Sequence, residues 1–362
     1  MTRIICVAGT RPNYMKIKAV MEALEQRGAE CVLVHTGQHY DYAMNELFFK
    51  ELRIRRPDQH LGVGSGTHAE QTGRAMLAFD PIVAALRPDI VVVDGDDNST
   101  LACALVATKA GQLVAHVEAG PRSGDWSMPE EVNRVVVDSI SDVLLVPSED
   151  AFANLRAEGY RQDKMHLVGN VSLDTLLANL DRARARPVLD SLGVPRGGFA
   201  LVTLHRPSNV DSHDTLGGLL RALAELAQEL PVVFPVHPRT RAKMIQDLPH
   251  GVLAVDPLGY LDFVALQDAA AVVLTDSGGV QAETTMLGVP CLTLRDNTEW
   301  PVTISKGTNQ LVGRDPFRIM AAARKLIECP PPPRRPALWD GRASQRVAEV
   351  LLSGHGLRSG SK

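Results

Sequence analysis

Short, almost wholly apolar runs alternate along the first half of the chain with segments in which apolar residues recur at helical spacing. Such runs predict strands buried on both faces, because a half-exposed strand would alternate polar and apolar residues. Helices between buried strands favour a parallel sheet with helices on both faces. The strands predicted in this half are Ile4–Ala8, Cys31–His35, Ile90–Val93, Leu113–Val117, Val143–Val146 and Met165–Val168, and two of the helices are Tyr14–Arg27 and Leu101–Ala110.

The same pattern restarts in the second half of the chain. The strands predicted there are Phe199–Thr203, Pro231–Val236, Val252–Val255, Ala271–Thr275 and Cys291–Leu294, with helices at Thr215–Glu229, Tyr260–Asp268 and Gly279–Leu287. The fold class predicted is therefore α/β, with two Rossmann-like, doubly wound parallel-sheet domains facing a cleft. Ligands of such sheets bind at the carboxyl ends of the strands, so functional motifs are expected in the loops that follow strands.

The domain boundaries follow from the break between the two sets of strands. An Arg-rich helix and a Gly-rich turn over residues 179–198 predict a hinge. The N-terminal Rossmann-like domain is expected over residues 1–178 and the C-terminal one over residues 199–330. A last helix is predicted at Ala343–Leu352, and the Gly/Ser-rich residues 353–362 are expected to form a mobile tail.

Composition and charge narrow the class of protein. The length, 362 residues, agrees with two domains at about 150 residues each. The formal net charge is −4, from 38 Lys and Arg against 42 Asp and Glu, so the basic excess of a typical nucleic-acid binder is missing. Apolar runs stay below the ~18 residues of a membrane helix, and five scattered cysteines without a C-x-x-C pair indicate neither disulfides nor zinc. We therefore expect a cytoplasmic protein with no metal, nucleic acid or membrane among its partners.

The first motif, Gly9–Lys16, lies directly after the first predicted strand. It is a turn into a helix that carries two cations, Arg11 and Lys16. A helix start of this kind suits a phosphate group, although a glycine turn with solvated charges is an equal alternative. The segment lacks the G-x-G-x-x-G pattern of a dinucleotide site.

Three carboxylates lie within four positions after the predicted strand Ile90–Val93, at Asp94, Asp96 and Asp97. Their mutual repulsion raises at least one pKa, which suits a group that transfers protons. A Mg²⁺ site and an acid-capped helix N-terminus are the alternative interpretations.

Further acids follow the strand Leu113–Val117. Glu118 ends that strand, and a charged residue there is rarely structural unless it is paired, here with Arg122 or Arg134. Glu130 opens the segment that leads to Arg134. Paired carboxylates in a cleft are what acid and base chemistry on opposite faces of a sugar requires.

The second half of the chain carries its own motifs after strands. His205 and Arg206 follow one strand, and His237 follows another. The strongest is Thr275–Glu283, where a strand ends in a Ser-Gly-Gly turn that opens a helix. Amides at such a turn can receive a diphosphate, and Glu283, one turn into the helix, can accept both hydroxyls of a ribose. This arrangement points to a nucleotide-sugar diphosphate.

Taken in order, these motifs resemble those of the non-hydrolysing UDP-N-acetylglucosamine 2-epimerases, from the first strand to about Gly313. Thr36–His39 and Gly169–Val171 carry the same resemblance. It implies the two-domain glycosyltransferase-B architecture, in which the helix Ala343–Leu352 crosses back onto the N-terminal domain. A UDP-sugar substrate and no cofactor are implied, and we expect a homodimer.

The resemblance also implies a mechanism. The proton at C2 is removed, UDP leaves C1 to give a glycal, and UDP adds back with protonation of C2 from the other face. The residues implied in catalysis are Asp96, Glu118, Glu130, Arg11 and His205. The residues implied in substrate binding are Lys16, Arg206, His237, Ser277, Gly278, Gly279 and Glu283.

A second ligand site is also implied, because bacterial members of that family bind a second UDP-GlcNAc as an allosteric activator. Gln38 and Gln71 match residues of that site, together with Glu130 and Arg206. Glu70 stands where an Arg is often found, and its charge would repel a diphosphate.

Several positions depart from the family pattern, and three of them leave the sugar open between UDP-GlcNAc and a modified UDP-sugar. Asp94 stands in place of the usual His, Asp97 in place of Thr, and Trp300 in place of Arg. The two acids either hydrogen-bond a group on the sugar or cap the helix that starts near Ser99.

Three alternative functions remain at this stage. A hydrolysing relative that releases UDP and free sugar shares most site residues. A glycosyltransferase of the same fold needs neither the three carboxylates nor Arg11. A non-catalytic nucleotide-sugar sensor is disfavoured by the intact carboxylates.

Overall fold

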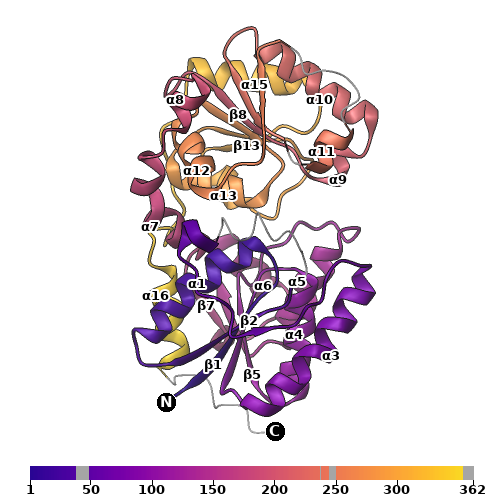
Figure 1. The fold of residues 1–362 in the computed structure, drawn as a ribbon, viewed down its shortest axis with the longest axis vertical. Coiled ribbons are helices and arrows are strands. Elements are labelled where there is room, and N and C mark those ends of the chain that lie inside the picture. The colour runs from indigo at the N-terminus through magenta and orange to yellow at the C-terminus, as the bar shows by residue number, and fades with distance from the viewer. Residues whose placement is uncertain (38–48, 237, 244–249, 354–362) are drawn as a thin grey trace. The chain divides into compact units, whose positions relative to one another are not determined.

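The computed structural model describes residues 1–37, 49–236, 238–243 and 250–353, and the chain divides into two compact units (Figure 1). The first unit comprises Met1–Leu177 and Ala337–Lys362, and the second comprises Ala178–Pro336. Each unit is built around its own parallel sheet, so each is described by itself.

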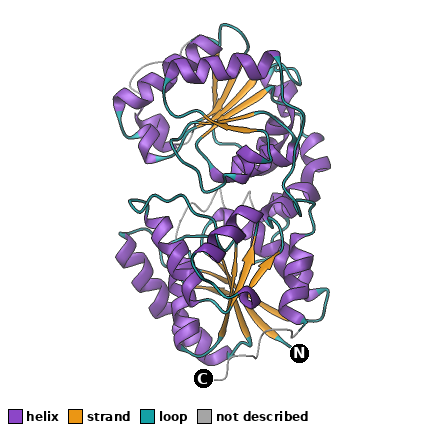
Figure 2. Ribbon diagram, turned by 180° about the vertical axis from the view of Figure 1, so that it is seen from behind, coloured by secondary structure: helices purple, strands orange, loops and turns teal. Residues whose placement is uncertain are grey.

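The described residues of the first unit form a seven-stranded sheet in the order β3-β2-β1-β4-β5-β6-β7, and all pairs are parallel. Helices cover both faces of this sheet (Figure 2). The strands are β1 (Arg3–Ala8), β2 (Glu30–His35), β3 (Gln59–His60), β4 (Ile90–Asp94), β5 (Leu113–Val117), β6 (Val143–Val146) and β7 (Met165–Leu167). The helices are α1 (Arg11–Glu25), α3 (His68–Leu86), α4 (Asn98–Lys109), α5 (Pro129–Ile140), α6 (Glu149–Ala157) and α16 (Ala343–Leu352), with α7 (Ser172–Arg184) leading into the second unit.

The helices of the first unit fall into two groups. α4 packs against both α3 and α5, and a buried cluster of Val, Ala and Phe side chains joins them to the central strands. α1 packs instead against α16, which returns to this unit from the far end of the chain. The indole N–H of the buried Trp339, just before α16, donates to the carbonyl of Pro147 at 2.9 Å. The C-terminal helix is therefore an integral part of the first unit.

The second unit has a six-stranded parallel sheet in the order β10-β9-β8-β11-β12-β13. Helices α10 and α15 pack together over one buried cluster, and α12 packs against α8 and α13. The strands are β8 (Ala200–Thr203), β9 (Val232–Pro235), β10 (Val252–Val255), β11 (Val272–Thr275), β12 (Cys291–Thr293) and β13 (Asn309–Leu311). The helices are α8 (Val188–Leu192), α9 (Pro207–Val210), α10 (His213–Leu226), α11 (Pro238–Lys243), α12 (Tyr260–Ala269), α13 (Gly278–Leu287), α14 (Val302–Ser305) and α15 (Pro316–Glu328).

Strand order places one switch point in each sheet. In the first sheet the chain moves outward from β1 through β2 to β3 and then crosses back to β4 on the other side of β1. In the second sheet β8 and β11 stand in the same relation. The connections leave in opposite directions at these pairs, which opens a crevice at the carboxyl ends where doubly wound sheets bind ligands.

The predicted α/β class with two doubly wound parallel sheets is confirmed. The segment predicted as a hinge, residues 179–198, forms the end of α7 and all of α8 and counts with the second unit. Two short edge strands, Gln59–His60 and Asn309–Leu311, were not predicted, because neither contains an apolar run. The tail 354–362 lies outside the described residues.

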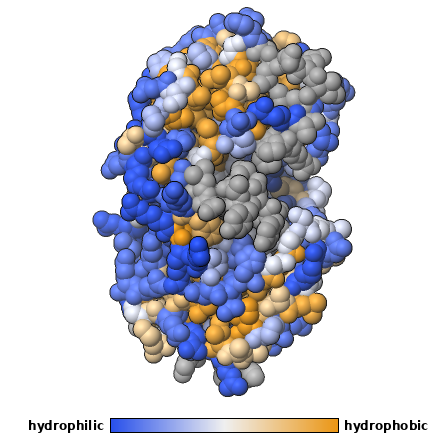
Figure 3. All heavy atoms as spheres, in the orientation of Figure 1, coloured by the Kyte–Doolittle hydropathy of each residue, from blue (hydrophilic) through white to orange (hydrophobic). Residues whose placement is uncertain are grey.

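The surface seen in Figure 3 is mainly polar, with smaller apolar areas on both units. Apolar side chains that stand singly on a surface are normal for globular proteins. Within the part of the chain that the structure describes, no helix has both the length and the apolar character needed to cross a membrane.

The hydrogen bonds that cap α16 allow a test of how this C-terminal helix is held on the first unit. Asp174 of α7 accepts hydrogen bonds from the backbone N–H groups of Ala343 and Ser344 at 3.1 and 2.6 Å. Asp174→Ala leaves these buried donors unpaired, so we expect the free energy of unfolding of the first unit to fall by about 1–2 kcal/mol. The measurement is urea unfolding followed by tryptophan fluorescence. Asp181→Ala, an exposed acid on the same helix, is the control, and equal losses in both variants would contradict the capping role.

Candidate active site

A buried ammonium group organises the switch point of the first unit. Lys16 of α1 lies 2.8 Å from a carboxylate oxygen of Glu118 and 3.4 Å from one of Asp94. Asn13, one turn earlier, donates to the other side of the same Asp94 oxygen at 2.9 Å and to the Asp94 carbonyl at 3.1 Å. The loop after β1 thus reaches the ends of β4 and β5, and each carboxylate faces the same cation.

The backbone of Glu118 is held in an uncommon conformation. Its φ is +69°, in the left-handed region that residues other than Gly adopt rarely and at some cost in energy. The N–H groups of Glu118 and Ala119 both donate to the carbonyl of Leu145, at 3.1 and 3.2 Å, which fixes this turn. Strain that is held in place by surrounding bonds is typical of functional positions.

Burial and charge shift the pKa values of this group in a consistent way. Burial raises the pKa of Asp94 and of Glu118, and Lys16 opposes that rise in both. For Glu118 the neighbouring charge of Asp94 raises the pKa further. Burial lowers the pKa of Lys16, but the charges of the two carboxylates outweigh it and keep the ammonium protonated. A carboxyl group with a raised pKa beside a fixed cation is suited to taking up and releasing a proton.

A buried histidine, His116, holds the loop next to these carboxylates in place. Both ring nitrogens of His116 face acceptors, Nδ1 the carboxylate of Asp138 at 2.7 Å and Nε2 the carbonyl of Gly95 at 2.8 Å. Burial lowers its pKa, but these two contacts outweigh that effect and raise it. Arg122 pairs with the other Asp138 oxygen at 2.8 Å. The imidazolium therefore fixes the Gly95 turn that lies between Asp94 and Asp96.

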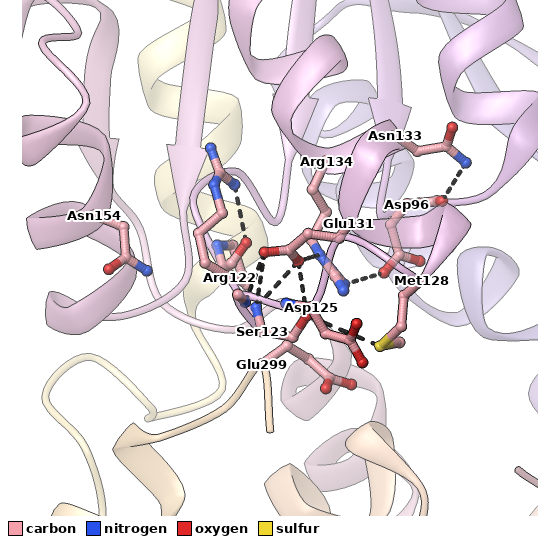
Figure 4. A network of polar contacts seen from close by, with 12 residues as sticks. Asp96, Arg122, Ser123, Asp125, Met128, Glu131, Asn133, Arg134, Asn154 and Glu299 are labelled. Atoms are coloured by element: carbon pink, nitrogen blue, oxygen red, sulfur yellow. Dashed lines mark hydrogen bonds and ion pairs between the residues drawn. The ribbon is translucent and has the colours of Figure 1, made fainter. Parts of the chain in front are cut away.

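Asp96 is held by α5 (Figure 4). Arg134 donates to its carboxylate at 2.7 Å, and Asn133 donates to its carbonyl at 2.8 Å. Arg134 is itself anchored by Glu131 at 3.0 Å. Glu131 also accepts hydrogen bonds from the backbone of Ser123, so one buried acid joins the loop after β5 to α5.

Asp97 has a local structural role. Its side chain accepts a hydrogen bond from the N–H of Thr100 at 2.8 Å and caps α4, as one sequence interpretation predicted. The second oxygen is buried, and a Cβ added to Gly9 would lie only 2.6 Å from it, so only glycine fits there. Burial raises the pKa of Asp97 to about 6.

The switch point of the second unit is organised by Asp276, which is fully buried. It accepts the backbone N–H groups of His205 and Arg206 at 3.0 Å and the side-chain amide of Asn209 at 3.1 Å. Nδ1 of His205 lies 2.8 Å from the same carboxylate. Burial raises the pKa of Asp276, but His205 and the N–H donors outweigh it and hold the pKa below its usual value. The carboxylate of Asp276 accepts a hydrogen bond from Nδ1 of His205, so Nε2 of the half-exposed imidazole is left for a ligand.

The Ser-Gly-Gly turn begins helix α13 at Gly278. A Cβ at Gly278 would lie 2.5 Å from Glu299 and 3.2 Å from the indole nitrogen of Trp300, so this position also requires glycine. Glu299 pairs with Arg295 at 2.8 Å and with Arg206 at 3.4 Å. The free N–H groups at the start of α13 and the nearby guanidinium suit a phosphate.

Glu283 lies further along α13, with only 7% of its surface exposed. Its two carboxylate oxygens accept hydrogen bonds from Tyr260 at 3.1 Å and from Gln267 at 2.6 Å. Burial raises its pKa, and these two donors oppose the rise.

The predicted site residues fall into two groups. Lys16, Asp96 and Glu118 gather at the first switch point, and Glu130 lies in the first turn of α5. The residues at the second switch point and along α13 are His205, Arg206, Ser277, Gly278, Gly279 and Glu283. Arg11 begins α1, but its side chain is outside the described part, as are Gln38 and His237.

Gln71, predicted at a second ligand site, is buried in α3. Its amide donates to the carbonyl of Gly64 at 3.4 Å and accepts from Asn98 at 2.8 Å.

Sequence reasoning missed the residues that hold the site residues in place. These are His116 and Asp138, Glu131 and Asn133, Asp276, Tyr260 and Gln267. Most are buried, where a polar side chain needs a partner. That signal was available for His116, which lies within an otherwise apolar strand. Among the described residues, no cluster of three or more His, Cys, Asp and Glu side chains could hold a metal ion.

The chain is an α/β protein with two Rossmann-like sheets. The acids clustered at the first sheet suit proton transfer, and the helix start at the second suits the phosphates of a nucleotide. A family model described as UDP-N-acetylglucosamine 2-epimerase matches residues 22–352. The chain is 38% identical to the UDP-N-acetylglucosamine 2-epimerase of Methanocaldococcus jannaschii, over 97% of this chain and 99% of that one. It is 40% identical to the UDP-2,3-diacetamido-2,3-dideoxy-D-glucuronate 2-epimerase of Pseudomonas aeruginosa, over 96% and 99%.

The crystal structure of the M. jannaschii UDP-GlcNAc 2-epimerase in complex with UDP-GlcNAc and UDP superposes with a TM-score of 0.88 at 38% identity, covering 98% of this chain and all of that one. The chain therefore belongs to the UDP-N-acetylglucosamine 2-epimerase family. The predicted family and enzyme class, an isomerase, are confirmed, and an epimerase is favoured over a hydrolase and a glycosyltransferase.

The raised pKa of Asp97 predicts a pH dependence of stability. Its folded pKa of about 6 lies above the usual 3.8, so the stability it contributes is fully present below pH 4 and is lost as the pH rises through 6. A shift of about two units corresponds to about 3 kcal/mol. Asp97→Asn keeps a helix cap but cannot ionise. We subtract the unfolding free energy of Asp97→Asn from that of the wild type. This difference is expected to fall by about 3 kcal/mol between pH 4 and 7.

The measurement is urea unfolding at several pH values. Asp80→Asn, an exposed acid on α3, is the control and should follow the wild type at every pH. A difference between the wild type and Asp97→Asn that does not change with pH would contradict the assignment.

Proposed function

We propose that the protein inverts C2 of a UDP-linked 2-acetamido sugar. The observation that carries this proposal is the Lys16–Glu118 pair at the first switch point, where a mostly buried carboxyl group has a raised pKa beside a fixed cation. The names of the two relatives support this substrate class. One names a UDP sugar with an acetamido group at C2, and the other names a UDP sugar with acetamido groups at C2 and C3.

The proposed reaction is an elimination followed by an addition. A carboxylate takes the C2 proton, the C–H electron pair forms the C1–C2 double bond, and UDP leaves C1 with the bonding pair. UDP then adds back to C1 while a second acid protonates C2 on the opposite face. Glu118, Asp96 and Glu130 are the carboxyl groups proposed for these transfers. The Arg134 contact at 2.7 Å orients Asp96 for such a role.

The second unit is proposed to hold UDP. The N–H groups of Gly278 and Gly279 and the hydroxyl of Ser277, whose own N–H donates to Thr275 at 3.0 Å, are suited to the diphosphate. Glu283 is suited to the ribose hydroxyls. The exposed edge of His205 and the guanidinium of Arg206 are proposed to stabilise the charge that develops on the leaving diphosphate.

The remaining assignments rest on the family resemblance. Arg11 and His237 are proposed to contact the diphosphate, and Lys16 to stabilise charge while it holds Glu118. Gln38 and Gln71 are proposed for a second UDP-GlcNAc site. We further propose a homodimer that works in the cytoplasm.

The two acids that depart from the family pattern have partners within the protein. Asp97 caps α4, and Asp94 is buried between Asn13 and Lys16. These contacts favour structural roles for both, so we propose that neither selects the sugar.

The experiment that tests the function is an incubation in deuterated water, with UDP-GlcNAc and with the diacetamido-glucuronate sugar nucleotide in parallel. NMR is expected to find deuterium at C2, with UDP still attached to the sugar in both epimers. Free UDP and free sugar in stoichiometric amounts would instead indicate hydrolysis. The sugar that exchanges faster identifies the substrate.

Glu118→Gln and Asp96→Asn keep the side-chain shape but remove a proton-transfer group. Each is expected to lower kcat by about a hundredfold or more, because positioned acids and bases contribute about 10²–10⁴. Melting temperature and UDP binding are expected to stay near the wild type. Glu22→Gln, an exposed acid on α1, is the control. A variant of Glu118 or Asp96 that turns over normally removes that residue from the mechanism.

A further inference from the structure

Two side chains of α12 bind the carboxylate of Glu283 from inside the protein. Nε2 of Gln267 donates to one oxygen at 2.6 Å, and the hydroxyl of Tyr260 donates to the other at 3.1 Å. Gln267 has no exposed surface. Since α12 packs against α13, the carboxylate is held by a neighbouring helix rather than by its own.

This arrangement leaves hydrogen-bonding capacity on both oxygens. An ionised carboxylate offers about four acceptor sites, and the two α12 donors occupy one on each oxygen. Among the described residues, these two donors leave one site on each oxygen for two adjacent hydroxyl groups. A neutral carboxyl group would offer fewer acceptors and would place its own proton in one of these directions.

The pKa of Glu283 lies above its usual value, because the effect of burial is larger than that of its neighbours. Burial raises the pKa of Glu283, and the hydrogen bonds from Gln267 and Tyr260 lower it. The other acids of α12 pair elsewhere, Asp262 with Arg186 and Asp268 with Arg184 and Arg196.

The other elements packed against α13 bring few titratable groups. Asp276, after β11, faces His205, and Cys291 of β12 contacts Thr284, while α14 and β13 carry no titratable side chain. Lowering of the Glu283 pKa therefore depends on two uncharged donors.

We propose that Gln267, assisted by Tyr260, is the positioning residue that aims the carboxylate of Glu283 to accept the two ribose hydroxyls of the UDP moiety. The proposal rests on the proposed function in one respect, that Glu283 meets the ribose. Neither Gln267 nor Tyr260 needs to touch the ligand.

The test is calorimetry of UDP and of 2′,3′-dideoxy-UDP with the full-length protein between pH 5.5 and 8. Gln267→Met keeps the length of the side chain but removes the donor. We expect it to weaken UDP binding by about tenfold at pH 7, with a larger loss at lower pH because the pKa of Glu283 is raised further. The variant is expected to bind the dideoxy nucleotide as tightly as the wild type does at each pH. Because both nucleotides carry the same diphosphate, comparing them also removes the effect of its titration.

Two further variants complete the design. Tyr260→Phe removes the longer hydrogen bond at a half-buried position, and we expect a smaller loss with the same dependence on pH and on the ribose hydroxyls. It also keeps the proposal testable if Gln267→Met does not fold. Gln228→Met, an exposed position in the second unit, should bind both nucleotides as the wild type does.

Unchanged UDP binding in Gln267→Met, or an equal loss for both nucleotides, overturns the proposal. The same two results in Tyr260→Phe also overturn it. Failure of the underlying function gives a different result. If the wild type itself binds UDP and the dideoxy nucleotide equally well, Glu283 does not hold the ribose. If it binds neither, the second unit is not the UDP site.

Discussion

Strands buried on both faces leave one place in each unit for polar chemistry, the loops at their carboxyl ends. The central strands of the sheets consist mainly of Val, Ile, Leu and Ala, and the described strand pairs are all parallel, so the loops that follow these strands meet at one edge. The switch points between β1 and β4 and between β8 and β11 separate the helices at that edge. The described polar clusters of both units depend on this constraint.

Buried acids mark both switch points, and each is paired. Asp94 and Glu118 share Lys16, and Asp276 gathers the N–H groups at the end of β8 with the ring of His205. An unpaired buried charge would be strongly unfavourable. The pairing therefore lets carboxylates stand where strands end, and it also sets their pKa values and directions.

The second layer of contacts comes from helices rather than from loops. α5 holds Asp96 through Arg134, and α12 holds Glu283 through Gln267. In both cases the carboxylate is held by a second element as well as by its own backbone, so its direction is fixed at both ends. The family likeness accounts for which acids are present, and these packing contacts account for how each is aimed.

Local pattern determined all the described strands except the edge strands Gln59–His60 and Asn309–Leu311, together with the two-sheet α/β class and the motifs after strands. The reason is that buried parallel strands are continuous apolar runs and turns need glycine. The family followed from the order of those motifs. Only the tertiary structure decided that Asp97 caps α4, that His116 bridges Gly95 and Asp138, and that Gln267 reaches Glu283. Apart from the cap, these contacts join residues 16 to 22 positions apart, and such pairings depend on how helices pack on a sheet, which no local pattern encodes.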